Sequence, residues 1–582
     1  MSEQTVGREP VQIIEIQQPM CAHVYGSSPC TAAGTDKCYN TRSTCQDAPN
    51  FTLGTPLSLF FSRGRFSEQE ISGAPYIIPS LKSVSTSPTK INVASASSDA
   101  KGLGNRAVCN ISFNDHPHTD RLVDPYLSTR SFDPMERGSF WSKWIARNKY
   151  RQNVVIKVYE CYSGADISMM MSRQYFLQSI THPDDSGNVK ITGKDILVRI
   201  EERKAQAPAL SPGKLYADIN DSVTSIEVAN AIEADYSAAG TIRISDELMT
   251  YSARATSANG ITFTITSRAS DNTIAEAHGV DDAVQECLRF TAERVDSVLD
   301  TLLTTYGGVP AAYLDTANWT IEADSHLAAL YLTTIITDPT SVFDLVSDIQ
   351  EQAMCFVWWD ERDAKVKLKA IRGVDVEPDM LTAETHILKG SFSIAELPRQ
   401  RTSQVWIHYN RNNYVKAKSE PTAYASQLVI ADLESETDEL YGEPSIRKVF
   451  ADWLHTDALA LSTASKIITR YVDIPRTCTF EMDAKDRQYW TGDNVRISHF
   501  LDVDQFGNRV IGQWAIISAE EVVAGERVKY VAEDTTLSGR ITVIMANDAP
   551  DYVGDGSDAF NGSWIGDDLG LLSNGDPCAR IN

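Results

Sequence analysis

Partly alternating apolar and polar positions recur along this chain and predict β-strands more often than helices. Such patterns occupy residues 106–113 (RAVCNISF) and 153–162 (NVVIKVYECY). The stretch 173–202 is predicted as strand, turn, strand, turn and strand, with the first turn at 184–187 (DDSG). Alternation places successive side chains on opposite faces, which suits a sheet with one buried face.

A small all-β module is predicted at residues 211–285. Apolar residues alternate with threonine from Ile261 to Ile265, directly after Asn259-Gly260. An Asn-Gly pair readily supplies the two positive-φ positions of a type I′ turn, so we expect a hairpin there. The module carries 4 basic and 11 acidic side chains, which suits an outward, solvated face.

Helices are predicted in fewer places. Residues 291–308 place apolar side chains on one face and end at Gly307-Gly308, a typical helix stop. Residues 341–354 begin with capping-box-like spacing and carry an apolar stripe. They run into a strand pair at 355–371, so a helix packed on a hairpin is the implied unit. Further helices are predicted at 140–150 and near 456–471.

Two segments lack a strong apolar pattern. Residues 83–104 are rich in Ser and Ala and are predicted to form a loop or linker. The last 36 residues hold seven Asp and six Gly, and they predict an extended tail that orders only against a neighbour. Between 396 and 535 strands return, with turns at 502–508 and 524–525, which suits a barrel or sandwich.

These patterns predict a mainly β fold with some α (α+β), divided among several domains. A chain of 582 residues is too long for one hydrophobic core. The predicted divisions are a cysteine-cluster module (1–55), a first β domain (56–210, with the linker 83–104), an inserted small β domain (211–285), a helix-plus-hairpin continuation of the first domain (286–395), a second β-barrel (396–535) and an acidic, Gly/Asp-rich tail (536–582).

Charge and hydropathy narrow the function classes. A net charge of −25, from 53 basic and 78 acidic residues, disfavours a surface that neutralises nucleic-acid phosphates. No apolar run reaches the roughly 18 residues that a membrane helix needs. The polar, acidic start differs from a secretory signal, so we expect folding in a reducing cytoplasm, where clustered cysteines favour metal ligation.

The candidate chemistry lies in four cysteines near the N-terminus, whereas the other six cysteines are scattered singly. The four are Cys21, Cys30, Cys38 and Cys45. Their C-x8-C-x7-C-x6-C spacing lacks the close C-x2-C pair of zinc ribbons and matches neither bacterial nor plant-type ferredoxins. The residues alone leave open an iron-sulfur cluster, a zinc site, two disulfides and no site.

Two other polar groups are weighed as sites. Residues 114–120 (NDHPHTD) combine oxygen and imidazole ligands for a divalent metal, but they are also typical of a polar turn around Pro117, which we favour. Asp360, Glu361 and Asp363 resemble a glycosidase pair, yet they fall at a predicted hairpin turn, where we expect solvated charges.

Several cysteines and aromatic residues are expected to be structural. Single cysteines among apolar residues predict small buried side chains rather than nucleophiles, at Cys287, Cys355 and Cys478. Aromatic residues at 356, 358 and 359 suggest a carbohydrate platform, but a core or subunit interface is preferred because both faces of one strand carry them. No G-x-S-x-G, H-E-x-x-H or P-loop motif is present, so we do not expect an enzyme.

The run CAHVYGSSPCTAAGTDKCYNTRSTCQDAPNF (21–51) resembles the cysteine signature of tail-tip and baseplate hub proteins of long-tailed bacteriophages and gene-transfer agents. The stretches FNDHPHTD, RGSFWSKWIARN and GNVKITGKDIL resemble the same group, which includes the tail tip protein L of phage lambda. The resemblance is specific over about the first 200 residues and extends further only in the order of β domains and helices. The lambda protein differs in being shorter and in carrying its cysteines near its C-terminus.

The resemblance implies a virion structural protein of the tail tip, assembled in the host cytoplasm. It implies a ring-forming hub, commonly a homotrimer, that closes the tail tube until DNA ejection. The implied partners are the distal tail protein ring, a central tail fibre or spike protein, and the tape measure protein. It also implies a 4Fe-4S cluster at Cys21, Cys30, Cys38 and Cys45, with zinc as the alternative. A host-receptor-binding role for residues 211–285 is the alternative function.

Overall fold

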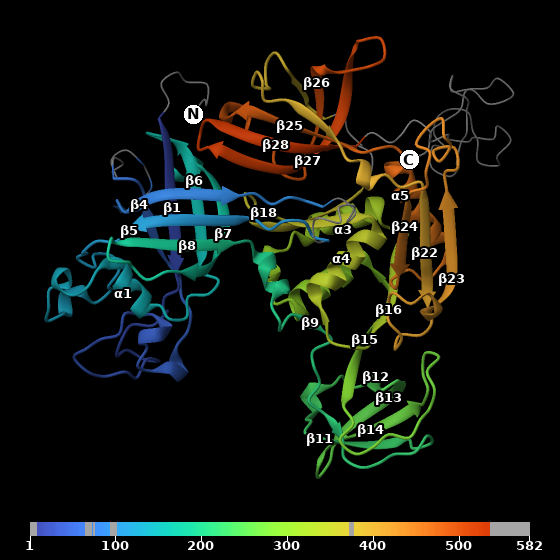
Figure 1. Cartoon of the computed structure of the whole chain (residues 1–582). Coiled ribbons are helices and arrows are strands. Elements are labelled where there is room, and N and C mark those ends of the chain that lie inside the picture. The colour runs from blue at the N-terminus through green and yellow to red at the C-terminus, as the bar shows by residue number, and fades with distance from the viewer. Residues whose placement is uncertain are drawn as a thin grey trace, which may run out of the picture.

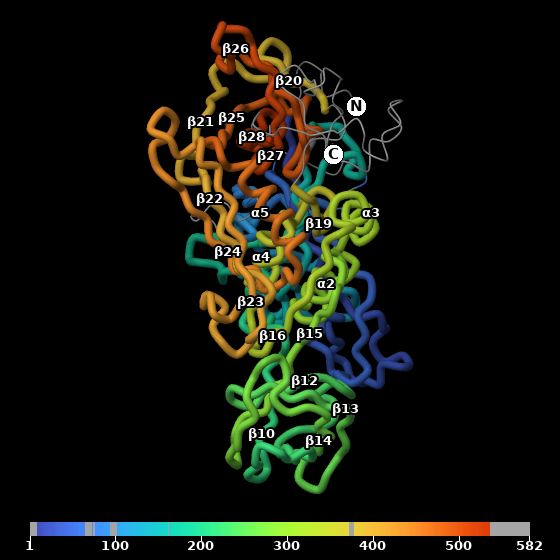
Figure 2. The backbone as a smooth tube through the Cα atoms, turned by 90° about the vertical axis from the view of Figure 1, so that its right-hand side faces the viewer, coloured from blue at the N-terminus to red at the C-terminus, as the bar shows by residue number. Residues whose placement is uncertain are grey.

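The computed structural model describes residues 9–64, 71, 73, 76–92, 102–371 and 378–535. The chain is mainly β with few helices, as predicted (Figure 1). The views in Figures 1 and 2 place a six-stranded sheet near one end, a small β module at the other end, and helices between them. The predicted C-terminal tail lies outside the described residues.

The N-terminal domain is built on an eight-stranded sheet with the order β3-β2-β1-β6-β7-β8-β5-β4. Helix α1 (Phe140–Arg147) buries Phe140, Trp141, Trp144 and Ile145 in the core of this sheet. The strands are β1 (Pro10–Gln18), β2 (Leu57–Phe61), β3 (Ile77–Ile78), β4 (Leu81–Ser87), β5 (Val108–Asn114), β6 (Val155–Tyr162), β7 (Met171–Ile180) and β8 (Asn188–Lys194).

This domain differs from the sequence predictions in three places. Strand β4 falls largely inside the predicted linker 83–104, because pairing with β5 orders a serine-rich edge that side-chain burial alone does not. Residues 93–101 of that linker lie outside the described part of the chain. The third predicted strand of 173–202 is instead a buried 3₁₀ helix, Ile196–Glu201. Strand β1 lies within 1–55 yet pairs with β2 and β6 in the sheet.

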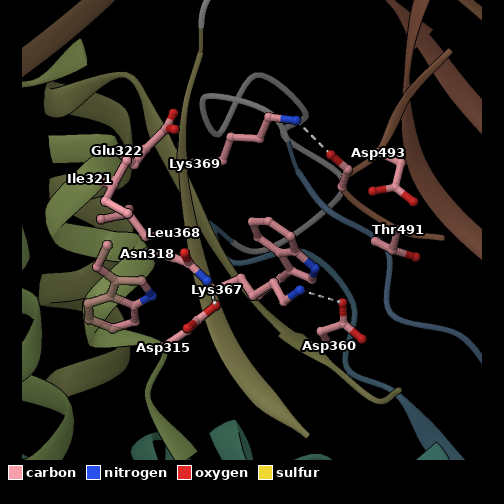
Figure 3. A pocket seen from close by; sticks show the side chains of 13 residues that line it. Asp315, Asn318, Ile321, Glu322, Asp360, Lys367, Leu368, Lys369, Thr491 and Asp493 are labelled. Atoms are coloured by element: carbon pink, nitrogen blue, oxygen red, sulfur yellow. Dashed lines mark hydrogen bonds and ion pairs between the residues drawn. The ribbon is translucent and has the colours of Figure 1, made fainter. Parts of the chain in front are cut away.

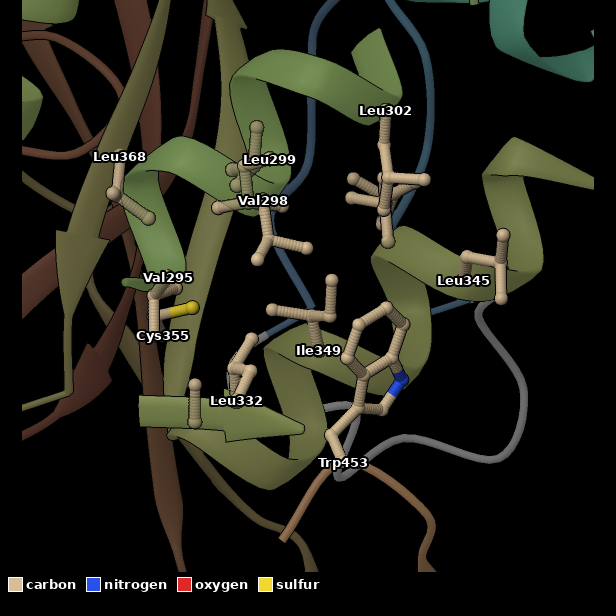
Figure 4. Packing of buried hydrophobic residues seen from close by; sticks show 14 of the residues in the cluster. Val295, Val298, Leu299, Leu302, Leu332, Leu345, Ile349, Cys355, Leu368 and Trp453 are labelled. Carbon is tan, nitrogen blue, oxygen red and sulfur yellow. The ribbon is translucent and has the colours of Figure 1, made fainter. Parts of the chain in front are cut away.

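The centre of the molecule contains helices packed around one large core (Figure 4). Helix α2 (Val295–Thr301) continues into a π-helical turn (Leu302–Tyr306) before Gly307, close to the predicted helix end. Helix α4 (Val342–Ala353) runs into the predicted hairpin of β18 (Cys355–Asp360) and β19 (Lys365–Ala370). Ser341 makes no side-chain cap on α4, so the expected capping box does not form. Helix α3 (Thr316–His326) was not predicted.

A three-stranded sheet joins this central core rather than the C-terminal sheet. Its order is β23-β22-β24, with β22 (Gln404–Arg411), β23 (Tyr424–Ala431) and β24 (Ile446–Ala451). Helix α5 (Asp457–Tyr471) covers it, and Thr456 caps this helix by accepting from Leu459 N. The core shared with α2 and α4 includes Val405, Val449 and Ile467. Residues 396–535 therefore do not share one hydrophobic core, because α5 and β22 bury their apolar faces in the central core with α2 and α4.

The remaining strands form two further sheets. The small module has the order β10-β11-β14-β13-β12-β15-β16, and its strand β15 continues into the central core. The C-terminal sheet has the order β20-β26-β27-β28-β25-β21. The bounds are β10 (Lys214–Leu215), β11 (Ser225–Ala229), β12 (Gly240–Ile244), β13 (Glu247–Thr256), β14 (Gly260–Ser267), β15 (Val284–Arg294), β16 (Tyr331–Ile336), β20 (Met380–Thr382), β21 (Ser393–Glu396), β25 (Arg476–Asp483), β26 (Asn494–Val503), β27 (Arg509–Val523) and β28 (Arg527–Asp534). Two short strands, β9 (Gln206–Ala207) and β17 (Thr340–Ser341), pair with each other.

The predicted hairpin after Asn259 forms, but its turn is different. Strands β13 and β14 pair from Thr256↔Ile261. Gly260 has φ +152° and begins β14, whereas Asn259 is not among the positive-φ residues. The type I′ prediction is therefore wrong: Ser257 N donates to Gly260 O, so the turn is centred on Ala258 and Asn259 instead of on Asn259 and Gly260. The predicted turns at 502–508 and 524–525 do connect neighbouring strands. No helix in the described residues has the length and apolar run needed to cross a bilayer.

Candidate cofactor site in the cysteine module

The four clustered cysteines lie in the loop-rich connection between β1 and β2, residues 19–56, which we call the cysteine module. Its regular structure consists of two 3₁₀ turns, Arg42–Thr44 and Ala48–Asn50. Tyr25 is its one buried apolar side chain. A segment with so little core needs another source of order, and metal–thiolate bonds supply it in many small modules because binding free energy becomes folding free energy.

The four thiols share one neighbourhood around Cys38. All four are half-buried and free of disulfides. Burial raises the pKa of the Cys38 thiol, and the charges of Cys45, Cys30 and Cys21 raise it further, against a hydrogen bond at Asn40 that lowers it. Within the described residues, no three His, Cys, Asp or Glu side chains are gathered closely enough to hold a metal ion as they stand. The donor set of four thiols fits either an iron-sulfur cluster or zinc.

Arg130 fastens the chain around Cys38 to the N-terminal domain. Its Nη1 donates to Lys37 O at 2.6 Å and its Nη2 donates to Cys38 O at 3.2 Å. The same guanidinium forms a two-point ion pair with Asp124, with Nε–Oδ2 at 2.7 Å and Nη2–Oδ1 at 3.0 Å. Both side chains of the pair are buried. A planar guanidinium that donates to four oxygen acceptors fixes both the position and the orientation of the chain around Cys38.

Tyr39 lies between two arginines. The guanidinium of Arg130 is 4.1 Å from its ring centroid and that of Arg147 is 3.9 Å from it. Arg147 is held in turn by Asp120, at 2.6 Å, and its backbone oxygen accepts from Thr41 Oγ1 at 2.6 Å. Cation–π contacts of this kind strengthen when they are removed from water. Residues 37–41 are therefore ordered by the domain beneath them.

A second set of contacts holds the module around Tyr25 and Ser43. Tyr25 N donates to Tyr126 Oη at 2.7 Å, and Tyr25 Oη donates to Gln46 Oε1 at 2.7 Å. Lys149 N donates to Ser43 Oγ at 2.7 Å. The domain surface thus pre-positions the module at several points along its length.

The sequence did not reveal the two charged residues, Arg130 and Arg147, that hold the cysteine module in place. The ammonium of Lys37 lies 5.0 Å from the ring centroid of Tyr126, and the guanidinium of Arg42 lies 5.3 Å from that of Phe51. Arg130 and Arg147 are about 90 and 110 positions away from Cys38 in sequence, so no local pattern connects them to it. The basic stretch containing them was the available signal, because an anionic thiolate site favours nearby cations.

The alternative metal ligands at 114–120 serve structural contacts. Asp115 Oδ1 accepts from Trp141 N at 2.9 Å, in the first turn of α1. Asp120 pairs with Lys143 at 2.7 Å and with Arg147 at 2.6 Å. Burial opposes ionisation of Asp120, but hydrogen bonds from His118, Lys143 and Arg147 outweigh it and hold its pKa well below the usual range. This geometry supports the polar-turn interpretation.

The predicted solvation of the acidic hairpin turn is wrong for two of its residues. Asp360 and Glu361 are 6% and 2% exposed. Glu361 accepts from Thr89 Oγ1 at 3.1 Å and from Trp490 Nε1 at 3.2 Å, where the N-terminal and C-terminal sheets meet the hairpin. Asp360 instead pairs with Lys367 at 3.3 Å. The two carboxylates thus serve different structural contacts. Docking of distant segments, which a local turn pattern does not encode, buries them.

The expected structural roles of the other cysteines and aromatic residues are confirmed. Burial raises the pKa of Cys287 and Cys355 to about 12, so these thiols stay protonated near neutral pH. Both residues are buried, as is Cys478. Phe356, Trp358 and Trp359 are also buried. None of the three rings is an exposed stacking platform.

No protein-family model and no curated protein matches this chain. Solved structures with a likeness to it include the tail protein from Neisseria meningitidis MC58, with 10% identity, a TM-score of 0.34 and coverage of 75% of this chain and 90% of that one. Another is the prophage MuSo2 43 kDa tail protein from Shewanella oneidensis, with 9% identity, a TM-score of 0.34 and coverage of 78% and 97%. A chain of a native gene transfer agent virion gives 11% identity, a TM-score of 0.28 and coverage of 58% and 92%. TM-scores this low do not establish a shared fold.

Proposed function

We propose that this chain is a virion structural protein, a hub subunit at the distal end of a phage-type tail. The observation that carries the proposal is the cysteine module. The segment whose sequence resembles the hub group (21–51) is a separate loop module. Arg130 and Arg147 clamp it onto the N-terminal sheet domain. The protein acts by assembly and gating, without bond chemistry.

The cofactor we propose is a 4Fe-4S cluster held by Cys21, Cys30, Cys38 and Cys45, with zinc as the alternative. The group would supply a covalent cross-link among loops that lack a core of their own. Arg130 would keep Cys38 in place and offset the negative charge of the bound thiolates.

The proposed assembly is a homotrimer that joins the distal tail protein ring to a central fibre or spike and contacts the tape measure protein. Such rings need large intersubunit surfaces. Apolar side chains gather on the hairpin between β26 and β27, where Phe500, Leu501 and Phe506 are 58%, 58% and 79% exposed. Exposed apolar patches of this kind commonly mark contacts with other proteins.

The test is complementation of a phage or gene-transfer particle that lacks the gene, followed by electron microscopy of the particles. Wild-type protein restores closed tails and is found at the tail tip by antibody labelling. Cys38→Ser yields tails without a closed tip, whereas the control Cys287→Ser, at a buried thiol outside the module, assembles normally. Complete tails in the absence of the protein would refute the hub role.

A second candidate function is receptor binding by the 211–285 module. The module has its own core, which includes Ile226, Ile242 and Phe263, and it extends from one end of the molecule (Figure 2). Its deletion separates the two functions. Loss of adsorption with intact tails favours receptor binding, and loss of tails favours assembly.

A further inference from the structure

A largely apolar groove of about 410 Å³ lies between the first part of α5 and the connection from α3 to β16. Leu459 lines it on α5, and Leu327, Leu330 and Tyr331 form the opposite wall. Tyr331 is 47% exposed, so part of this apolar lining is accessible to solvent. Ligand pockets usually measure about 300–1,000 Å³. The groove is therefore large enough to hold a few apolar side chains.

The groove carries basic rather than acidic side chains, although the net charge of the chain is −25. Its lining includes His326, His455 and Lys466, and none of the described residues that line it is Asp or Glu. In the described part of the chain no carboxylate forms an ion pair with Lys466, and partial removal from water lowers the pKa of its ammonium group. A carboxylate next to this ammonium would offset the loss of water. The groove therefore suits an apolar segment that also carries acidic side chains.

A second cavity has the opposite charge balance (Figure 3). It lies where α3, the β18–β19 hairpin and the loop before β26 meet. Its acidic side chains outnumber its basic ones: Asp315, Glu322, Asp360 and Asp493 against Lys367 and Lys369. Nearby carboxylates disfavour a further negative charge. An acidic segment is therefore disfavoured in that cavity and favoured in the groove beside α5.

The described chain ends beside the last turn of α5. Arg470 Nη2 donates to Glu533 Oε1 at 2.8 Å and to Asp534 O at 3.4 Å. Lys466 lies one helical turn before Arg470, a rise of about 6 Å along the helix axis. The last described residue, Thr535, therefore lies next to the helix that forms one wall of the groove.

The sequence after Thr535 includes a stretch in which large apolar residues flank a pair of carboxylates, residues 564–572 (WIGDDLGLL). The carboxylates belong to Asp567 and Asp568, and 28 residues separate Thr535 from Trp564. A flexible chain of this length has a root-mean-square span of roughly 30 Å, whereas the whole of α5 is about 22 Å long. The segment can therefore reach the groove of its own chain, at a local concentration on the order of millimolar.

We propose that residues 564–572 dock in this groove of the same chain, with apolar side chains in the groove and Asp567 or Asp568 paired with Lys466. The proposal is independent of the hub function and of the cysteine module. Docking covers apolar surface that would otherwise stay exposed on the free subunit, where such surface favours unwanted association. It gives the acidic C-terminal tail a binding site in the central part of the molecule.

Hydrogen exchange followed by mass spectrometry, on the full chain, tests the proposal. Amides in 564–572 should exchange at least about tenfold more slowly than in an unstructured peptide of the same sequence. Replacing Leu569, Leu571 and Leu572 together with aspartate should abolish this protection and should speed exchange at groove residues 327–331. This variant changes only the tail, so it tests the proposal even if substitutions in the groove impair folding.

A charge reversal tests the ion pair. Lys466→Glu should speed exchange in 564–572 about tenfold, because it replaces an attractive charge with a repulsive one. Combining it with Asp567→Lys and Asp568→Lys should restore the protection. Lys448→Glu is the matched control, since this exposed lysine on β24 does not line the groove, and it should leave the exchange of 564–572 unchanged.

The protein concentration distinguishes docking within one chain from docking between chains. Protection of 564–572 should stay constant on dilution, because the segment and the groove belong to the same molecule. Three results would overturn the proposal: no protection of 564–572, protection that survives both the leucine substitutions and Lys466→Glu, or protection that disappears on dilution. The last would assign the groove to the tail of a second copy of the chain.

Discussion

Replacing Arg130 with alanine is the sharpest perturbation of the cysteine module. The substitution leaves the carboxylate of Asp124, 1% exposed, without its two-point partner. It also removes the donors to Lys37 O and Cys38 O and one of the two cations on Tyr39. Breaking a buried ion pair from one side costs about 3–5 kcal/mol, and the other contacts overlap with this value rather than add to it.

Hydrogen exchange followed by mass spectrometry measures this cost locally. Each 1.4 kcal/mol changes the opening equilibrium tenfold, so amides in 21–53 should exchange roughly 100-fold faster or more in Arg130→Ala. Amides in the paired strands β1 and β6 should change much less. Arg130→Lys keeps the positive charge but loses the planar, two-point guanidinium geometry, so its exchange rate in 21–53 should lie between those of the wild type and Arg130→Ala.

Arg137→Ala is the control, because the guanidinium of this exposed arginine in the same region lies 4.1 Å from the centroid of the Phe132 ring, outside the cysteine module. Its exchange in 21–53 should match the wild type. If Arg130→Ala also matched the wild type, Arg130 would not hold the module and the proposed pre-positioning of Cys38 would be refuted.

Three further predictions concern stability. Glu247→Gln should lower the free energy of unfolding of the 211–285 module by about 3–5 kcal/mol, because the fully buried Glu247 loses its two-point ion pair with Arg268. Urea denaturation of the full chain, followed by hydrogen exchange at peptides of the module, measures this loss. Despite the opposing effect of burial, hydrogen bonds led by Arg268 lower the pKa of Glu247 to about 2. The stability that Glu247 contributes should therefore be fully present above its pKa in the unfolded chain, about 4.3, and should disappear as the pH falls toward 2. If the module lost stability in acid equally in the glutamine variant, this prediction would be contradicted. Leu302 is fully buried in the central core, so Leu302→Ala should lower the free energy of unfolding by about 2–5 kcal/mol in the same denaturation experiment. The control Leu461→Ala, at a 50% exposed position, should lower it far less. Equal losses would contradict the core assignment.

Sequence patterns correctly predicted helices and strands where the apolar residues that form the buried face follow one another closely in sequence. Helix α4 and the β18–β19 hairpin follow the predicted ranges, since their apolar stripes are continuous in sequence. Strand β4 was missed because its order comes from backbone pairing with β5, while most of its side chains are exposed or half-buried. The 3₁₀ helix at Ile196–Glu201 was predicted as a strand because four apolar residues in six fit either structure when all are buried.

The candidate site was predictable as four cysteines but not as a positioned module. The clustering of the four cysteines marked the candidate module, whereas Arg130 and Arg147 reach Tyr39 only through the fold. The burial of Glu361 likewise depends on Thr89 and Trp490, residues about 270 and 130 positions away. Contacts at this separation leave no local signature, so sequence reasoning assigned Glu361 to the solvent.

Metal analysis with an ultraviolet-visible spectrum, on anaerobically purified wild type and Cys38→Ser, tests the central claim most directly. The wild type should contain about four irons per chain and show a broad absorption near about 400 nm, as expected for a 4Fe-4S cluster on four thiolates. Cys38→Ser should lose most of both signals. Zinc alone would leave a structural metal module but contradict the cluster, and a metal-free protein with Cys21, Cys30, Cys38 and Cys45 in disulfides would contradict the account of the module altogether.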